Sequence, residues 1–154
     1  MNRPRLRAAT LVVAGTAALV APGCRTMSDV VKDKDNGTVQ TYPVDADQSW
    51  KIAMQVFRWE GADAIEEHRD QNMMLTSSGM NFFSAGAFMG AWIEPVDAAN
   101  TKVTVVTKRR IATNIATTLT ETTFHRRFQQ AVDIVKSGKP LPIESPPETV
   151  ASGK

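Results

Sequence analysis

An uncharged apolar run near the start of the chain most constrains which residues can belong to a folded domain. Residues 8–21 contain no charged side chain, and they follow a segment that holds three arginines and no acid. A basic region, an apolar run and small residues before a cleavage point are typical of a secretory signal. A run of 14 residues is shorter than the roughly 20 that a membrane-spanning helix needs. We therefore expect residues 1–23 to be a signal peptide, with a short membrane anchor or a buried helix as the alternative.

Cys24 is the only cysteine of the chain and follows that run almost directly. A single cysteine in an exported protein asks for an explanation, because it has no partner for an internal disulfide. The segment Val20-Ala21-Pro22-Gly23-Cys24 resembles the lipobox of bacterial lipoproteins; Gly23 and Cys24 match it, whereas Ala21 and Pro22 depart from it. The alternative is an ordinary signal that is cleaved nearby and leaves Cys24 as a free thiol.

The resemblance to lipoproteins implies that Cys24 becomes the first mature residue and carries a diacylglyceryl group and an N-acyl chain. Two or three acyl chains anchor a protein stably, because each buried methylene contributes about 0.8 kcal/mol. The resemblance also implies export and a membrane-anchored position facing the periplasm. In enterobacterial members an aspartate after the cysteine retains the protein at the inner membrane, so Arg25 favours the outer membrane in a Gram-negative organism.

Removing residues 1–23 changes the charge of the chain. The whole chain has 18 basic and 16 acidic residues, and three of the arginines lie in residues 1–23, so 15 basic and 16 acidic residues remain. The excess positive charge therefore belongs to the targeting signal, and we expect no nucleic-acid binding from it. The mature chain also lacks a second cysteine, so its core and not a disulfide must hold the fold.

Composition divides the remaining chain into three parts. Residues 24–37 are mostly polar and end in an Asn-Gly turn signal, so we expect the lipidated cysteine and a flexible tether. Thirteen flexible residues reach roughly 20 Å, which is enough to clear the lipid headgroups. Residues 140–154 contain four prolines and are expected to form a disordered tail. Residues 38–139 are then expected to form a single domain.

The first part of that domain predicts a strand followed by a helix. Residues 38–44 are rich in β-branched and aromatic side chains, and Pro43 indicates the end of the strand or a sheet edge. Asp45 is expected to cap a helix, with Gln48 as its capping-box partner, and Gly61 is expected to end it. The expected apolar face of this helix is Ala46, Trp50, Ala53, Met54 and Phe57.

The rest of the domain predicts three or four strands and a second helix. The expected strands are residues 62–69, 73–78, 82–96 and 102–111. Thr118 and Glu121 are expected to form a capping box ahead of the helix, and Gly138 to end it. The apolar stripe of that helix is Phe124, Phe128, Ala131, Val132 and Val135. Grouped strands and separate helices favour an α+β fold. We expect an antiparallel sheet of four to five strands with both helices on one face. The expected element order is β-α-β-β-β-β-α or β-α-β-β-β-α.

Several of these features together resemble known lipoprotein domains. The pattern is Trp50 and Ala53 on the first helix, Gly61 at its end, a turn at Gly79, and the run Lys102-Val103-Thr104-Val105 before the last helix. It is similar to small proteobacterial lipoprotein domains of unknown function and, more loosely, to the helix-grip domains of the outer-membrane assembly lipoprotein BamC. The resemblance spans about residues 38–137 and supports the fold more than the function.

Residues that could carry chemistry are few. His68 with Glu66 and Asp70 could bind a divalent metal, since imidazole and carboxylates are suitable ligands. A strand places residues 66, 68 and 70 on one face by simple alternation, so a solvated polar face is the simpler interpretation. His125 is expected on the surface of the last helix. No nucleophile motif and no cofactor-binding motif is recognised, and Ser77-Ser78-Gly79 is more simply a turn.

The stretch from Met80 to Ile93 is unusual because both of its strand faces are apolar or small. Antiparallel strands normally have one polar face, and the helices can cover only one. The other face, with Phe82, Phe88 and Trp92, is therefore a candidate contact for a partner protein, a second copy or the membrane interface. The alternatives are that the tether or the tail covers this face, or that part of the stretch is a loop.

Charge is segregated along the mature chain. Residues 25–101 hold 6 basic and 12 acidic residues, whereas residues 102–139 hold 8 basic and 2 acidic residues. A basic zone could contact anionic headgroups or an acidic partner. The alternative is that these charges meet the acidic half across the fold. The candidate basic surface consists of Lys108, Arg109, Arg110, Arg126 and Arg127.

These observations favour a non-enzymatic envelope lipoprotein that acts as a binding or assembly module. Its expected partners are the membrane, through Cys24, and an envelope protein or a second copy. One alternative is a periplasmic lipoprotein that binds a small molecule or a lipid in an apolar cavity between helices and sheet. A metal-dependent hydrolase that uses His68 is the remaining alternative. The residues that would line the cavity are Met54, Phe57, Met89 and Phe128.

Overall fold

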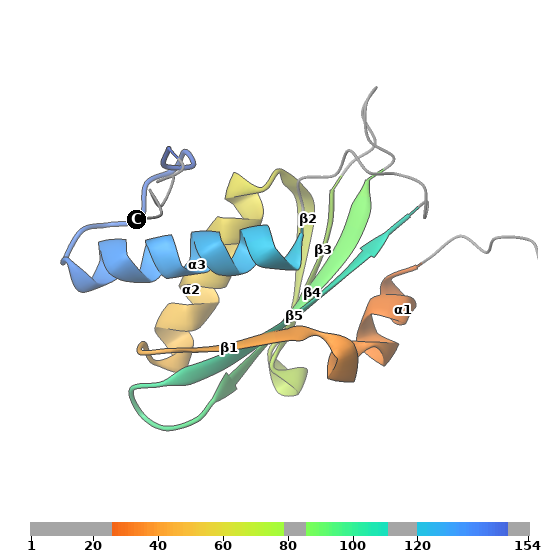
Figure 1. The fold of residues 1–154 in the computed structure, drawn as a ribbon, viewed down its shortest axis with the longest axis horizontal. Helices are drawn as coiled ribbons and strands as arrows, with labels where there is room; N and C mark the ends of the chain where they lie inside the picture. Colours follow the sequence, from red (N-terminus) through yellow and green to blue (C-terminus); the bar gives the residue numbers. More distant parts are fainter. Residues whose placement is uncertain (1–25, 79–85, 111–119, 148–154) are drawn as a thin grey trace, which may run out of the picture.

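The computed structural model describes residues 26–78, 86–110 and 120–147. Within them, five strands form one antiparallel sheet in the order β1-β5-β4-β3-β2 (Figure 1). The strands are β1 (Thr38–Tyr42), β2 (Ala62–His68), β3 (Met73–Ser78), β4 (Ala87–Pro95) and β5 (Thr101–Arg109). The helices are α1 (Met27–Lys32), α2 (Ala46–Trp59) and α3 (Glu121–Lys136), with short 3-10 turns η1 (Lys34–Asn36) and η2 (Arg69–Gln71). The α+β fold with an antiparallel sheet is confirmed.

Helix α2 begins and ends where its sequence predicts. The Asp45 carboxylate accepts a hydrogen bond of 2.8 Å from the backbone N–H of Gln48, which satisfies one of the free donors of the first turn. Gly61 follows the helix with φ +77°, a left-handed conformation that glycine adopts without a steric penalty. The buried face of the helix includes Trp50, Ala53 and Phe57, as expected.

Helix α3 has the predicted apolar stripe but a different start. Phe124 and Phe128 are fully buried, and Gly138 follows the helix with φ +75°. The N-cap is Thr120, whose hydroxyl accepts from the Thr123 N–H at 3.2 Å, whereas the expected cap Thr118 lies outside the described residues. The predicted capping-box role of Glu121 is wrong because its carboxylate accepts from the β5 backbone N–H of Thr107 at 2.9 Å.

Both long helices pack on one face of the sheet (Figure 1). Alternate residues of β4 face them, and these are the members of the apolar face that the sequence assigns to residues 87, 89, 91 and 93. An aromatic cluster joins the layers, with ring centroids 4.3 Å apart for Tyr42 and Phe128 and 5.0 Å apart for Phe57 and Phe124. Strand β1 lies at a sheet edge and ends before Pro43, as predicted.

The expectation of a flexible tether over residues 24–37 is wrong for the part that the structure describes. Residues 26–37 form α1 and η1, and the Val30 side chain is completely buried. The Thr26 backbone N–H donates to the Asp29 carboxylate at 2.7 Å, which is one half of a capping box. The segment is ordered because its apolar residues find an apolar face of the sheet that α2 and α3 do not cover.

The expectation of a disordered tail over residues 140–154 is also wrong for residues 140–147. This segment lies against α2 and α3, and Leu141 packs against the main core. Its backbone carbonyls accept hydrogen bonds from helix side chains, beginning with Trp59 and Gln55. Prolines restrict the unfolded chain, so ordering this segment costs less conformational entropy than its length alone implies.

Within the described ranges, none of the helices is both long enough and apolar enough to cross a membrane.

His125 lies in the interior, which corrects the expectation of a surface position. Its side chain is 2% exposed, with Nδ1 2.8 Å from the Tyr42 hydroxyl and Nε2 3.0 Å from the Thr38 carbonyl oxygen. A carbonyl oxygen can only accept, so in the neutral ring Nε2 carries the proton and Nδ1 accepts from Tyr42. Burial lowers the pKa of the imidazole and raises the pKa of Tyr42.

The buried imidazole makes stability depend on pH. The folded-state pKa of His125 lies below its ordinary value of about 6.5, so the unfolded chain binds more protons as the pH falls through that value. The contribution of His125 to the free energy of unfolding is therefore fully present above about pH 6.5 and decreases below it. Denaturant titrations between pH 7.5 and pH 5 should show this loss in the wild type.

The loss should be smaller in His125→Gln, because glutamine cannot take up the proton. Thr122→Ser is the matched control, because it is an exposed change on the same helix that adds or removes no titratable group, so the slope should equal that of the wild type. An identical pH dependence in the wild type and in His125→Gln would contradict the assignment.

Candidate functional site

The candidate site is the second face of the sheet, opposite α2 and α3. Phe88 and Trp92 lie on it in one apolar cluster, as the alternation of β4 predicts, whereas Phe82 lies outside the described residues. Residues from α1, β3 and β5 complete this cluster. Its members are Met27, Val30, Met73, Leu75, Phe88, Trp92 and Val106.

Helix α1 covers this face, so it is not the open contact surface that the sequence suggests. Val30 is fully buried in the cluster, Trp92 is only 4% exposed, and Phe88 is half-buried. A partner, a second copy or a membrane could reach Trp92 only after α1 had moved away. The correct interpretation is one of the alternatives, that the segment after Cys24 covers the face itself.

Two glycines allow α1 and η1 to lie close to the strands. A Cβ at Gly90 on β4 would lie 2.8 Å from the Val30 Cγ1 atom and 3.0 Å from the Trp92 ring. A Cβ at Gly37, before β1, would lie 2.7 Å from the Val105 carbonyl oxygen. Contacts below 3.0 Å force a shift of the neighbouring atoms, so a side chain at either position would push the N-terminal segment off the sheet.

Charged pairs surround the apolar contact. The Lys34 ammonium lies 2.8 Å from a Glu94 carboxylate oxygen, and Lys102 lies 2.9 Å from the other oxygen. Hydrogen bonds from these two lysines hold the pKa of Glu94 below its ordinary value. Asp33, the residue directly before Lys34, pairs with Lys108 of β5.

The apolar contact contributes more than the charged pairs do. The pairs are partly exposed, so each stabilises the fold by at most about 1 kcal/mol. Burying a side chain such as Val30 contributes roughly 1.5–3 kcal/mol. The pairs therefore fix the position of η1, and the burial of Val30 holds the helix down.

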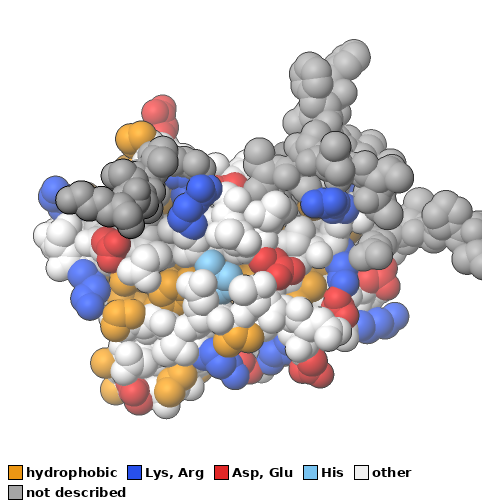
Figure 2. Space-filling view, viewed as in Figure 1, with side chains coloured by type: hydrophobic (Ala, Val, Ile, Leu, Met, Phe, Trp, Pro, Cys, Tyr) orange, Lys and Arg blue, Asp and Glu red, His pale blue; other side chains and the backbone are white. Residues whose placement is uncertain are grey.

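The candidate basic residues do not form one surface. Lys108 pairs with Asp33 on the α1 side, and Arg110 lies over the Phe88 ring at 4.5 Å. Arg126 and Arg127 belong to α3 on the other face, where the Arg127 Nε lies 3.4 Å from a Glu60 oxygen. Figure 2 shows basic and acidic side chains interspersed around the visible face. The basic residues of 102–139 are thus divided between two faces of the fold, and acidic residues of 25–101 partly neutralise them.

Arg109 completes that set as an exposed residue at the end of β5.

The metal candidates of the sequence lie at the end of β2. The His68 Nε2 is 3.7 Å from a Glu66 oxygen, but Asp70 lies in η2 and so does not share the strand face. Within the described ranges, no group of three histidine, cysteine or acidic side chains is placed to hold a metal ion. Arg69, between them, lies 4.5 Å over the Trp50 ring and bonds to Glu67 at 3.1 Å, which ties this turn to α2.

The side chains proposed for a ligand cavity pack as core. Phe57, Met89 and Phe128 are fully buried in the same cluster, and Met54 packs against its edge. They contact their neighbours in the helix-to-sheet layer, as the Phe57 ring does with Phe124. This geometry gives the lipid-binding alternative no support in the described residues.

Two groups were missed by sequence reasoning, the α1 contact and the buried pair of Tyr42 and His125. The first had a signal, because Thr26 and Asp29 stand at capping-box spacing and Met27 and Val30 at helical spacing. The second had none, since a histidine between a phenylalanine and an arginine fits a surface position equally well.

Comparison with protein-family models finds no match for this chain, and comparison with curated proteins finds none. The proposals below therefore depend on the residues and their geometry.

The contact between Val30 and Gly90 can be tested by a double-mutant cycle. Gly90→Ala should lower the free energy of unfolding by about 1–3 kcal/mol, because the added methyl overlaps Val30 and the Trp92 ring. Val30→Ala removes the atom that lies 2.8 Å from the new methyl, so Gly90→Ala should cost less in that background. Chemical denaturation of the four proteins measures the coupling.

The matched control is Val31→Ala, which shortens the exposed neighbour of Val30 and should not couple to Gly90. Strict additivity of Gly90→Ala and Val30→Ala would show that α1 does not pack on β4 as described.

Proposed function

We propose that this chain is a lipid-anchored protein of a bacterial cell envelope that acts as a non-enzymatic binding or assembly module, held directly against the membrane. The signal-like residues 1–23 and the lipobox-like segment ending at Cys24 support the anchor. The packing of α1 supports the close attachment, and this is the observation that carries the proposal.

Very little chain separates the anchor from the domain. Only Arg25 stands between Cys24 and the first described residue, Thr26, and two residues extend at most about 7 Å. A flexible tether of 13 residues would have given a reach of roughly 20 Å. The lipid therefore joins the protein at the start of α1, on the second face of the sheet.

This attachment gives the domain a direction. The second face and α1 lie next to the headgroups, and the sheet separates them from α2 and α3 (Figure 1). The helix face is then the one presented to the periplasm and to its proteins. A module with one face towards the membrane and the other towards the periplasm suits binding or assembly.

The contacts of His125 and Glu121 hold the fold together, so the proposal assigns neither residue a catalytic role. The His125 ring is engaged with Tyr42 and with the backbone of Thr38, so both of its nitrogens hold structure together. A general base needs one nitrogen directed at a substrate. Glu121 is similarly used to join α3 to β5.

The anchor is tested by Cys24→Ser. Metabolic labelling with a fatty-acid probe should mark the wild type and not the variant, because serine cannot form the thioether to the lipid. The variant should also move from the membrane fraction to the soluble fraction. Thr122→Ser, an equally small change at an exposed site on α3, is the control and should label normally. Equal labelling of wild type and Cys24→Ser would refute the lipid anchor.

The orientation is tested separately with nitroxide labels on the lipidated chain in vesicles. Val31→Cys places the label on the exposed side of α1, and Gln129→Cys places it on the exposed side of α3. Nickel-chelating headgroups should relax the label at residue 31 more strongly, since that helix adjoins the anchor. Equal relaxation at both positions would contradict attachment through the second face.

A further inference from the structure

Side chains of α2 and α3 bind residues 140–147, the part of the proline-rich tail that the structure describes. From α2, Gln55 and Trp59 both donate to the Pro142 carbonyl oxygen at 3.1 Å, and Gln55 also donates to the Ile143 carbonyl oxygen at 3.1 Å. From α3, Arg127 donates to the Pro146 carbonyl oxygen at 2.6 Å and Gln130 to the Pro147 carbonyl oxygen at 3.1 Å. Four side chains on two helices thus hold four backbone carbonyl acceptors, those of residues 142, 143, 146 and 147.

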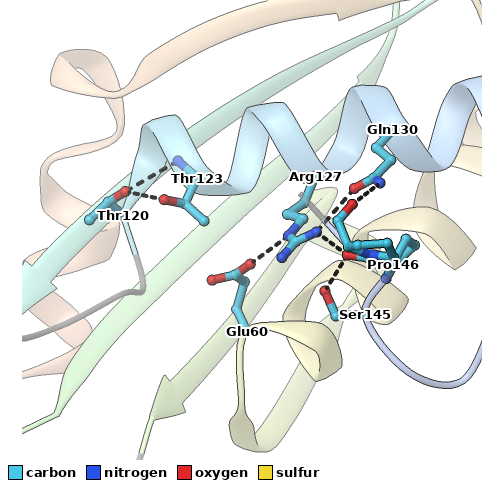
Figure 3. Close-up of polar contacts among 8 residues, drawn as sticks. Glu60, Thr120, Thr123, Arg127, Gln130, Ser145 and Pro146 are labelled. Atoms are coloured by element: carbon cyan, nitrogen blue, oxygen red, sulfur yellow. Dashed lines mark hydrogen bonds and ion pairs between the residues drawn. The ribbon is translucent and has the colours of Figure 1, made fainter. Parts of the chain in front are cut away.

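These donors are fixed in place by the protein. The Arg127 Nε lies 3.4 Å from a Glu60 oxygen, and their side chains are only 11% and 6% exposed (Figure 3). The guanidinium also donates to the Gln130 Oε1 at 3.1 Å, which turns the Gln130 amide nitrogen towards the Pro147 carbonyl oxygen. A preorganised donor loses less entropy when its acceptor arrives.

The hydrogen bonds of the site are made to the main chain of the tail, and Leu141 is the tail side chain that packs against the core. Each of these hydrogen bonds ends on a backbone carbonyl, and the Ile143 side chain is 90% exposed. Three of the four acceptor residues are prolines, which have no N–H and a fixed φ, so the segment loses little conformational freedom when its carbonyls are bound. Domains that bind proline-rich segments use aromatic side chains for this purpose, and Trp59 is the aromatic donor here.

We propose that this face of α2 and α3 is a binding site for a proline-rich segment of another envelope protein, and that the chain's own tail occupies it in cis. The proposal names the ligand class of the binding module and rests on the proposed function. The α2–α3 face is the one that this function directs towards the periplasm.

The tail is then a competitor that sets the threshold for binding. A short link from Gly138 gives it an effective concentration in the millimolar range, so a partner must bind more tightly or through several segments. Leu141 packs against the core, and hydrogen bonds from α2 and α3 hold the rest of the tail over the residues that the structure describes. Hydrogen bonds of this kind contribute about 1 kcal/mol each, which allows exchange.

The test uses the full chain with the tail weakened in place. Leu141→Asp with Pro142→Gly, Pro146→Gly and Pro147→Gly should release the tail without changing a donor. The probe is a fluorescent peptide with the sequence of residues 139–154. Its anisotropy titration should show at least tenfold tighter binding to this variant than to the wild type, because the competitor is gone.

Site variants and a control peptide show whether the proposed contacts are responsible. Adding Trp59→Phe and Gln130→Ala to the released-tail variant should weaken binding at least tenfold, since two donors are lost. Gln129→Ala, a neighbouring exposed change on α3, should have no effect. A peptide with alanine in place of its four prolines should bind at least tenfold more weakly.

Three results would overturn the proposal. The first is equal binding of the native peptide and the alanine peptide. The second is peptide binding that is unchanged by Trp59→Phe with Gln130→Ala. The third is a dimer in sedimentation of the released-tail variant mixed with wild type, because a second copy would then be the occupant. If the released-tail variant does not fold, NMR of the wild type provides the test. The native peptide at millimolar concentration should shift the signals of the Trp59 indole N–H and the Gln130 side-chain amide. The alanine peptide at the same concentration should leave both signals unchanged.

None of these measurements needs a membrane. A failure of peptide binding would therefore leave the lipid anchor at Cys24 intact, and a failure of lipid labelling would leave the peptide site intact.

Discussion

The contact of Val30 with Gly90 determines how the rest of this protein is arranged. The sheet has two apolar faces, and α2 and α3 cover only one of them. A glycine on β4 leaves room for a single valine, and that valine draws the segment after Cys24 onto the sheet. Without this contact the second face would be an exposed apolar patch. With it, the start of the described chain is held on that face, which is the basis of the orientation that we propose.

Much of the fold follows from local patterns. The alternation in β4, the Asp45 cap and the glycine after each long helix were sufficient to place the main elements, because short-range interactions determine them. The two segments that were predicted as flexible, before residue 38 and after residue 139, were misjudged for one common reason. Their order comes from surfaces that other segments provide, Gly90 for Val30 and Trp59 for the tail. Composition contains no information about such long-range contacts.

The candidate sites were less predictable than the fold. Phe88 and Trp92 were correctly placed on one face, but whether that face is open depends on the six residues of α1. The basic residues form a cluster in the sequence and separate in space, since β5 and α3 lie on different layers. The tail site had no sequence signal, because its donors are ordinary helix side chains and its acceptors are backbone atoms.

The docking of α1 is the central claim, and amide hydrogen exchange on the chain in solution, without a membrane, tests it most directly. A helix of six residues is not stable alone in water. Slow exchange of the amides at Asp33 and Gly37, whose N–H groups bond to Val30 and Lys34, can therefore come only from packing on the sheet. The account predicts protection there comparable to that of β4. Exchange at the rate of an unstructured peptide, beside a protected β4, would contradict it.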